Sequence, residues 1–88
     1  MEYAEHYCYV EPDIRLHYID EGSGRTIVFV TGFSGSAQGF EHQIEYFKQS
    51  FRVIAVDPRN HGKSSWSPRG NTYAQQGRDL GVLMETLG

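Results

Sequence analysis

Two short apolar segments, each followed by a loop that contains glycines, constrain most strongly what this chain can fold into. The first is Thr26–Val30, and the second is residues 53–56, with the sequence Val-Ile-Ala-Val. After its first residue neither segment alternates apolar with polar side chains, which is typical of strands covered on both faces of a sheet. Residues 31–52 are enough for a loop, a helix and a return, as a parallel crossover requires. The sequence therefore predicts two parallel strands.

The residues before the first apolar segment predict an antiparallel hairpin. Residues 7–10 and residues 14–20 are dominated by aromatic and branched side chains, which favour strands. The Glu-Pro-Asp that separates these ranges predicts a turn, because proline presets the dihedral angle of the first central turn residue.

Two helices are predicted, one on either side of residues 53–56. Residues 37–49 carry large apolar side chains at i, i+4 and i+7, the spacing of one helical face. Thr72 is suited to cap a last helix, which Gly77 and Gly81 weaken unless the sheet approaches closely there. The expected inward face of this helix consists of Tyr73, Gln76 or Gly77, Leu80, Leu83 or Met84, and Leu87. The order β-β-β-α-β-α predicts an α/β fold with an antiparallel hairpin, then parallel strands with crossover helices.

The composition excludes several classes of partner. Eight lysines and arginines oppose eleven aspartates and glutamates, and no basic run is present that would bind a nucleic acid or an anionic membrane surface. The apolar segments are too short to cross a bilayer and the first residues lack a signal-peptide pattern, so we expect a soluble, cytoplasmic protein. The single cysteine, Cys8, excludes an internal disulfide and is predicted to be a small buried side chain. The four histidines lack metal-ligand spacing, and we expect neither a metal site nor a cofactor.

The order and spacing of these segments resemble those of the α/β-hydrolase family. Residues 26–40 resemble that family's third strand, oxyanion loop and first helix. Residues 52–65 resemble its fourth strand and the following loop, here Asp-Pro-Arg-Asn-His-Gly-Lys-Ser from Asp57 to Ser64. The resemblance extends over nearly the whole chain and favours the branch of esterases, lipases and cofactor-independent haloperoxidases.

The resemblance implies roles for residues in both loops. Carried over by position, the backbone amide of Phe33 would contribute to an oxyanion hole, and Ser34 beside it is a candidate for lining the pocket. Trp66 in the second loop is more often a packing residue in such a position, with pocket lining as the alternative. The two loops would be shaped by Gly32, Gly35, Asp57, His61 and Gly62. Two positions depart from the family pattern: Thr31 replaces a usual histidine, and Asn60 replaces a usual glycine but tolerates left-handed backbone.

The family's catalytic nucleophile has no counterpart in these residues. The pentad Gly-x-Ser-x-Gly does not occur in the sequence, and in the family's chain order the nucleophile, acid and base would all follow residue 88. We therefore expect residues 1–88 to form a single partial α/β-hydrolase domain without the nucleophile strand, inactive alone. A catalytic pair of Asp57 and His61 is the alternative, but the loop pattern favours structural roles for both.

Two functions follow from the resemblance. The first is hydrolysis of a small carboxylic ester by a serine-type enzyme, to which this chain contributes the oxyanion loop. An aspartate nucleophile, as in dehalogenases and epoxide hydrolases, stays open, although Ser34 stands where such epoxide hydrolases usually have proline. The alternative is a non-catalytic fragment that self-associates or binds a partner through Thr26–Val30, because the family's third strand lies between the fourth and fifth and would here be an unpaired apolar edge.

Overall fold

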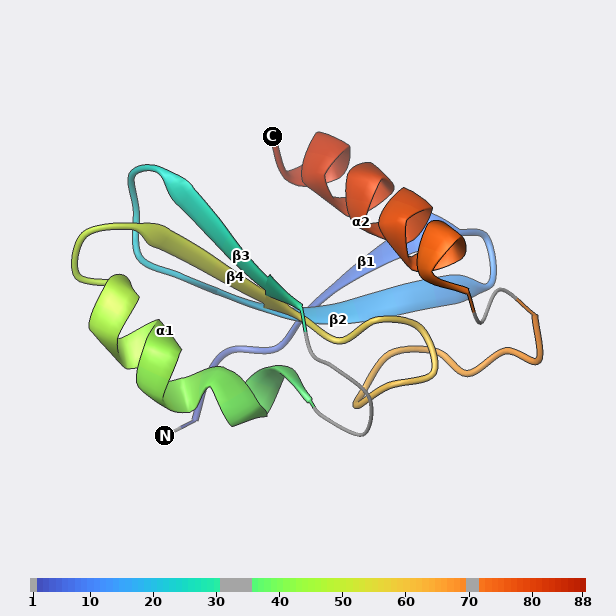
Figure 1. Ribbon diagram of the computed structural model, residues 1–88, viewed down its shortest axis with the longest axis horizontal. Coiled ribbons are helices and arrows are strands. Elements are labelled where there is room, and N and C mark those ends of the chain that lie inside the picture. Colours follow the sequence, from blue (N-terminus) through green and yellow to red (C-terminus); the bar gives the residue numbers. More distant parts are fainter. Residues whose placement is uncertain (1, 31–35, 70–71) are drawn as a thin grey trace.

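A computed structural model describes residues 2–30, 36–69 and 72–88 and shows the predicted mixture of strands and helices (Figure 1). Its elements are β1 (His6–Glu11), β2 (Ile14–Glu21), β3 (Thr26–Val30), the 3-10 helix η1 (Ala37–Phe40), α1 (Glu41–Phe47), β4 (Arg52–Val56) and α2 (Tyr73–Leu87). No helix in these three ranges combines the length and the apolar character needed to cross a membrane.

The strands form one sheet in the order β1-β2-β4-β3. β1 pairs with β2 and β2 with β4 in antiparallel fashion, whereas β3 and β4 pair in parallel, with Ile27 opposite Val53 and Phe29 opposite Ala55. The predicted hairpin and the predicted parallel pair are both confirmed. Within the described sheet β3 lies at the end of the order, so only one of its edges is paired.

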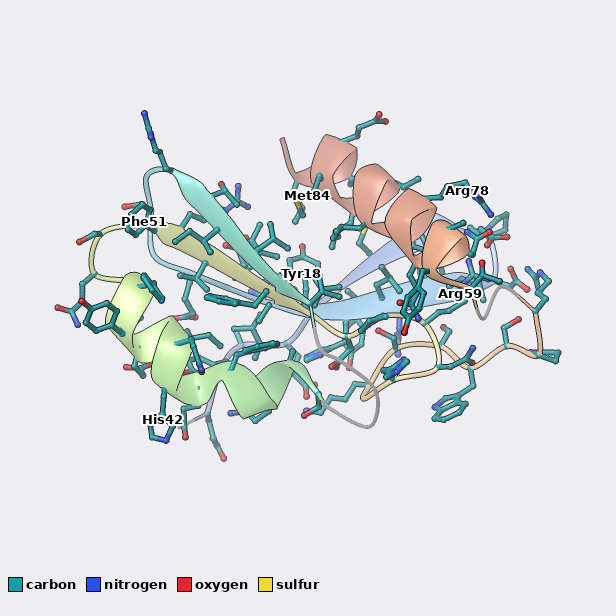
Figure 2. The ribbon with its side chains drawn as sticks, viewed as in Figure 1. Tyr18, His42, Phe51, Arg59, Arg78 and Met84 are labelled. Atoms are coloured by element: carbon teal, nitrogen blue, oxygen red, sulfur yellow. The ribbon has the colours of Figure 1, made fainter. Side chains whose placement is uncertain are left out.

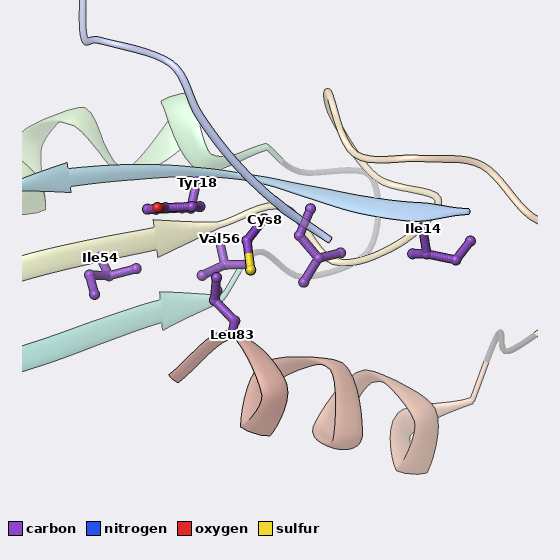
Figure 3. Packing of buried hydrophobic residues seen from close by; sticks show 7 residues of the cluster. Cys8, Ile14, Tyr18, Ile54, Val56 and Leu83 are labelled. Atoms are coloured by element: carbon purple, nitrogen blue, oxygen red, sulfur yellow. The ribbon is translucent and has the colours of Figure 1, made fainter. Parts of the chain in front are cut away.

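The two faces of β4 supply two separate cores. Ile54 and Val56 belong to a cluster that also contains Leu83 of α2 (Figure 3), whereas Val53 and Ala55 belong to a cluster with Ile44 of α1. Figure 1 shows α1 and α2 on opposite sides of the sheet. Successive residues of a strand point to opposite faces, and both faces of β4 are covered. This explains why its sequence is a continuous apolar run. Cys8 is buried in the first cluster, as predicted.

The helix predicted over residues 37–49 is shorter and begins differently. Its first turn is the 3-10 helix η1, and the α-helix ends at Phe47. There the Phe47 carbonyl accepts from the amides of Ser50 at 3.1 Å and Phe51 at 2.9 Å, so the turn into β4 satisfies the helix end. The predicted apolar stripe is present: the Phe29 ring lies 5.1 Å from the Phe40 ring and 6.0 Å from the Phe47 ring, measured between centroids.

The cap and most of the buried face of α2 are as predicted, with two differences, at Tyr73 and Asp79. Thr72 caps the helix, because its hydroxyl accepts from the amide of Gln75 at 3.1 Å. Leu83 is buried and Leu80, Met84 and Leu87 are partly buried, whereas Tyr73 is 92% exposed and Gly77 is exposed. Placing Tyr73 on the inward face was therefore wrong, whereas of the pair Gln76 or Gly77 it is Gln76 that is half-buried. The inward face also includes Asp79, which was not predicted and which binds Arg59.

Candidate functional site

The candidate site lies where β3 and β4 end. Because these strands are parallel, the segments that follow them leave the same edge of the sheet, and ligands of open α/β sheets bind outside such strand ends. The predicted oxyanion-loop residues Gly32, Phe33, Ser34 and Gly35 lie outside the described residues. The described part begins again before η1 and includes the whole loop after β4 up to residue 69.

Asp57, the first residue after β4, joins the parts of this site. Its side chain is 1% exposed. One carboxylate oxygen, Oδ1, accepts from the amide of Ala37 at 2.5 Å, and the other, Oδ2, accepts from the amide of Lys63 at 3.1 Å. Oδ2 also lies 2.7 Å from Nδ1 of His17 on β2. We name Asp57, His17, Ala37, Lys63 and Ser64 the Asp57 cluster. A single carboxylate thus connects η1, the loop after β4 and strand β2.

Ser64 completes the cluster through its side-chain hydroxyl, which bonds to backbone atoms of Asp57 and His17. Its hydroxyl donates to the carbonyl of Asp57 at 2.5 Å and accepts from the amide of His17 at 2.8 Å. The amide of Asp57 in turn donates to the carbonyl of His17 at 3.0 Å. These bonds extend the contact between β2 and β4 beyond the last strand pair, Tyr18 with Val56. The part of the loop from Asp57 to Ser64 is therefore bonded to β2 at both of its ends.

The loop between Asp57 and Ser64 turns through two left-handed residues. Asn60 has φ 67° and Gly62 has φ 48°, so the left-handed backbone expected at Asn60 is present. A β-carbon on Gly62 would lie 2.4 Å from the carboxylate of Asp57. Glycine is required here for two reasons, since the backbone is left-handed and the carboxylate fills the space that a side chain would need.

The imidazole at hydrogen-bond distance from Asp57 belongs to His17, which the sequence analysis did not single out. His61, the histidine considered there, has its Nδ1 3.0 Å from the carbonyl of Arg59. Which atom donates in this contact depends on the tautomer of His17: Nδ1 donates to the carboxylate in the tautomer that carries the hydrogen there. No feature of the sequence alone singles out His17, because its place beside Asp57 follows from the pairing of Tyr18 with Val56.

A second buried ionic contact joins the loop after β4 to α2 and β1. The side chain of Arg59 is 1% exposed, and its Nε and Nη2 each lie 2.9 Å from an oxygen of Asp79 on α2. Nη2 also contacts Glu11 at the end of β1. The bonds to Asp79, opposed by burial and supported by Glu11, raise the pKa of Arg59 above its usual value. Figure 2 shows Arg59 beside the first turn of α2.

Two further features border the loop. Trp66 is 76% exposed, so its ring is not part of either core. A shallow, open hollow of about 490 Å³ is lined by Glu2, Tyr3, Glu5, Gln38 and Lys63. Its lining is polar, unlike the mostly apolar lining of typical ligand pockets. Among the described residues, no group of three histidine, cysteine or acidic side chains could hold a metal ion.

Known proteins are similar to this chain in sequence and in fold. The family model described as alpha/beta hydrolase fold matches residues 25–88. Bifunctional epoxide hydrolase 2 of Rattus norvegicus is 39% identical over 71 residues, which are 80% of this chain and 13% of that protein.

Solved structures agree with these matches. The bromoperoxidase from Bacillus anthracis has a TM-score of 0.89 at 30% identity, over 96% of this chain and 31% of that chain. Epoxide hydrolase CorEH has a TM-score of 0.91 at 29% identity, over 99% of this chain and 30% of that chain. The chain spans less than a third of the length of each of these proteins.

Proposed function

Because this chain belongs to the α/β-hydrolase fold family, we propose that it is the N-terminal segment of a serine-type hydrolase of small carboxylic esters. The observation that carries the proposal is the Asp57 carboxylate, which binds the first amide of η1 and an amide of the loop after β4. These are the segments that leave the carboxyl ends of the parallel strands, where such folds bind ligands. The chain would supply one wall of the active site.

The chemical contribution of this chain to the reaction would be a backbone amide that binds the oxyanion. In acyl transfer a serine attacks the carbonyl carbon, a histidine takes the serine proton, and an acid orients the histidine. The negative charge that develops on the carbonyl oxygen is stabilised by backbone amides. We assign one of these amides to Phe33 and pocket-lining roles to Ser34 and Trp66. The nucleophile, base and acid would come from residues outside this sequence, so the chain alone would be inactive.

The proposal is tested by supplying the missing part of the sheet. The 88-residue chain is mixed with a separately produced C-terminal portion of the Bacillus anthracis bromoperoxidase, comprising the residues that this chain does not match, and a short-chain nitrophenyl ester is added. We expect nitrophenol release from the mixture and none from either part alone. A matched control has alanine in place of the serine expected at the nucleophile elbow of an α/β hydrolase. A folded one-to-one complex without turnover would count against the proposal.

Epoxide hydrolysis is a second candidate, favoured by the names of two similar proteins, the rat bifunctional epoxide hydrolase 2 and CorEH. In that reaction an aspartate would open the epoxide ring, and water would release the diol. Ser34 argues against it, since proline is usual at that position. A C-terminal portion of CorEH, mixed with this chain and a styrene oxide substrate, would form diol if this candidate holds.

A non-catalytic role is the alternative function, and the open edge of β3 favours it. β3 is paired with β4 on one side, and its residues Thr26–Val30 include no charge or proline to discourage pairing with another strand. The chain would then associate with a second copy or another strand through this edge. Sedimentation of the 88-residue chain tests this role, and a monomer that persists at high concentration would contradict it.

A further inference from the structure

His17 is the one side chain that contacts the carboxylate of Asp57 within the described residues; the two other contacts come from backbone amides. We infer that His17 is a positioning residue for the candidate site. Its Nδ1–H holds the Asp57 carboxylate in the orientation that binds the amides of Ala37 and Lys63 together. The catalytic consequence of this inference rests on the proposed function, whereas the structural consequence does not.

The carboxylate depends on His17 because its burial leaves few other donors. Asp57 is 1% exposed, and without the imidazole Oδ2 would keep only the Lys63 amide, at 3.1 Å. A buried acceptor that loses a partner carries a desolvation penalty, so the side chain would turn toward other donors or water. This rotation of the Asp57 side chain would weaken the hydrogen bond from the amide of Ala37 to Oδ1, because both oxygens belong to one rigid carboxylate.

His17 is itself held firmly enough to act in this way. Its amide donates to Ser64 and its carbonyl accepts from Asp57, so the backbone of His17 is bonded on both sides to the loop it orients. Its ring lies 5.4 Å from the ring of Tyr7 on β1, measured between centroids. Such support around a side chain is what fixes the geometry of a functional site.

The orientation of Asp57 determines where two segments meet. Ala37 is fully buried and is the first residue of η1, and Lys63 belongs to the loop that leaves β4. A carboxylate that binds both amides sets the distance between η1 and this loop. In a completed enzyme a displacement of about 1 Å in such a wall lowers the rate by about 10²-fold. We therefore expect loss of His17 to lower kcat more than it raises KM.

Two substitutions separate the hydrogen bond from the packing of the ring. His17→Phe keeps a ring of similar size but removes Nδ1, so it should fill the same space without donating to Asp57. His17→Asn removes most of the ring but places an amide nitrogen on the same side-chain carbon, Cγ, to which Nδ1 is attached. If hydrogen bonding is the role of His17, asparagine should restore what phenylalanine loses. If packing is its role, the ranking should be reversed.

The test uses nuclear magnetic resonance of the 88-residue chain. In the wild-type protein, a long-range proton–nitrogen spectrum should show the His17 hydrogen on Nδ1. In His17→Phe, hydrogen exchange of the Ala37 amide should accelerate about tenfold and its proton resonance should shift, because one charge-assisted bond is weakened. In His17→Asn, most of the protection should return. The matched control is His6→Phe, because the His6 ring stacks on Tyr18 at 5.2 Å and lies outside the Asp57 cluster.

Several results would overturn the inference. One is a wild-type His17 with its hydrogen on Nε2 alone, a measurement that needs no variant to fold. Another is an unchanged Ala37 resonance and exchange rate in a folded His17→Phe. A third is stronger Ala37 protection in the phenylalanine variant than in the asparagine variant. If the amide results hold but no mixture with a C-terminal portion turns over ester, the positioning role stands and the proposed function fails.

Discussion

At the scale of single residues, the site depends on how one buried carboxylate is satisfied. Asp57 accepts from two amides and lies 2.7 Å from an imidazole nitrogen, and these partners come from η1, from the loop after β4 and from β2. Gly62 makes room for that carboxylate, and Ser64 ties the backbone of Asp57 to β2. Each contact is local, but together they determine where the two segments that leave the sheet lie.

Gly62→Ala should destabilise the protein by about 2 kcal/mol or more, because it adds left-handed strain and a β-carbon that would lie 2.4 Å from the Asp57 carboxylate. Urea denaturation followed by circular dichroism measures the loss. Gly39→Ala is the matched control, since no atom lies within 4 Å of the β-carbon it would add. Equal stability of Gly62→Ala and the wild type would contradict this role of Gly62.

Glu11 contacts the buried guanidinium of Arg59, and this contact lowers the pKa of Glu11 below its ordinary value of 4.5. A carboxyl whose folded pKa is depressed stabilises the fold above its unfolded pKa, and this contribution is lost as the pH falls through the folded pKa. Glu11→Gln should therefore make the free energy of unfolding less dependent on pH below 4.5. Urea titrations at several pH values test this, with Glu85→Gln as an exposed control. Identical pH profiles for Glu11→Gln and the wild type would refute it.

At the scale of elements, α2 is attached to the rest of the fold by charge as well as by apolar contact. Leu83 packs into the first core, and the carboxylate of Asp79 forms two bonds of 2.9 Å with Arg59. Gly77 and Gly81 contribute no close packing, because a β-carbon added to either glycine would have no atom within 4 Å. The sheet therefore does not approach these glycines, and they only weaken the helix.

Gly77→Ala and Gly81→Ala should each stabilise the protein by up to about 1 kcal/mol, since alanine restores helix propensity without a clash. For a domain of this size that amounts to an increase in Tm of about 4–8 °C per kcal/mol. Thermal denaturation followed by circular dichroism measures it. A lower Tm for either variant would show that the glycine serves a purpose that the structure does not reveal.

Asp79→Asn should destabilise the fold by about 3–5 kcal/mol, because it leaves the buried Arg59 without its main counter-charge. The double variant Arg59→Met with Asp79→Leu should recover much of this loss, since buried ion pairs often tolerate apolar replacement. Denaturant unfolding of both proteins gives the two values. A single variant as stable as the wild type would contradict the importance of this pair.

The sequence predicted the elements better than their mutual orientation. β3 and β4 were predictable because strands covered on both faces leave an apolar run, and the Thr72 cap follows from residue type. The burial of Asp79 on α2 was not predictable, because its partner Arg59 is 20 positions away in the sequence. The contact between His17 and Asp57 spans 40 positions and became visible only once β2 was placed beside β4.

At the scale of the whole molecule, the described sheet has an interior strand covered on both faces, β4, and two edge strands, β1 and β3. β4 is paired on both sides and covered on both faces, whereas β3 ends the sheet order. The similar proteins are more than three times as long as this chain, as the 31% and 30% coverage of two solved structures indicates. The open edge of β3 is therefore where association of this chain is expected.

Val30→Lys should reduce any self-association of the 88-residue chain, because a lysine on an edge strand opposes pairing with a second strand. Val30 is 41% exposed, and Val82 on α2 is 40% exposed, so Val82→Lys is a control of matched exposure and charge. Sedimentation velocity over a range of concentrations measures the change. Equal effects of the two lysines would show that association does not use the β3 edge.

The most direct test of the hydrolase assignment is the rate of ester hydrolysis while a C-terminal portion of the bromoperoxidase is titrated into a fixed amount of this chain. We predict a background rate for the chain alone and a rise that saturates at one equivalent, abolished when the serine expected at the nucleophile elbow is replaced by alanine. Enzymatic turnover by the 88 residues alone, or a saturated and folded complex without turnover, would contradict it.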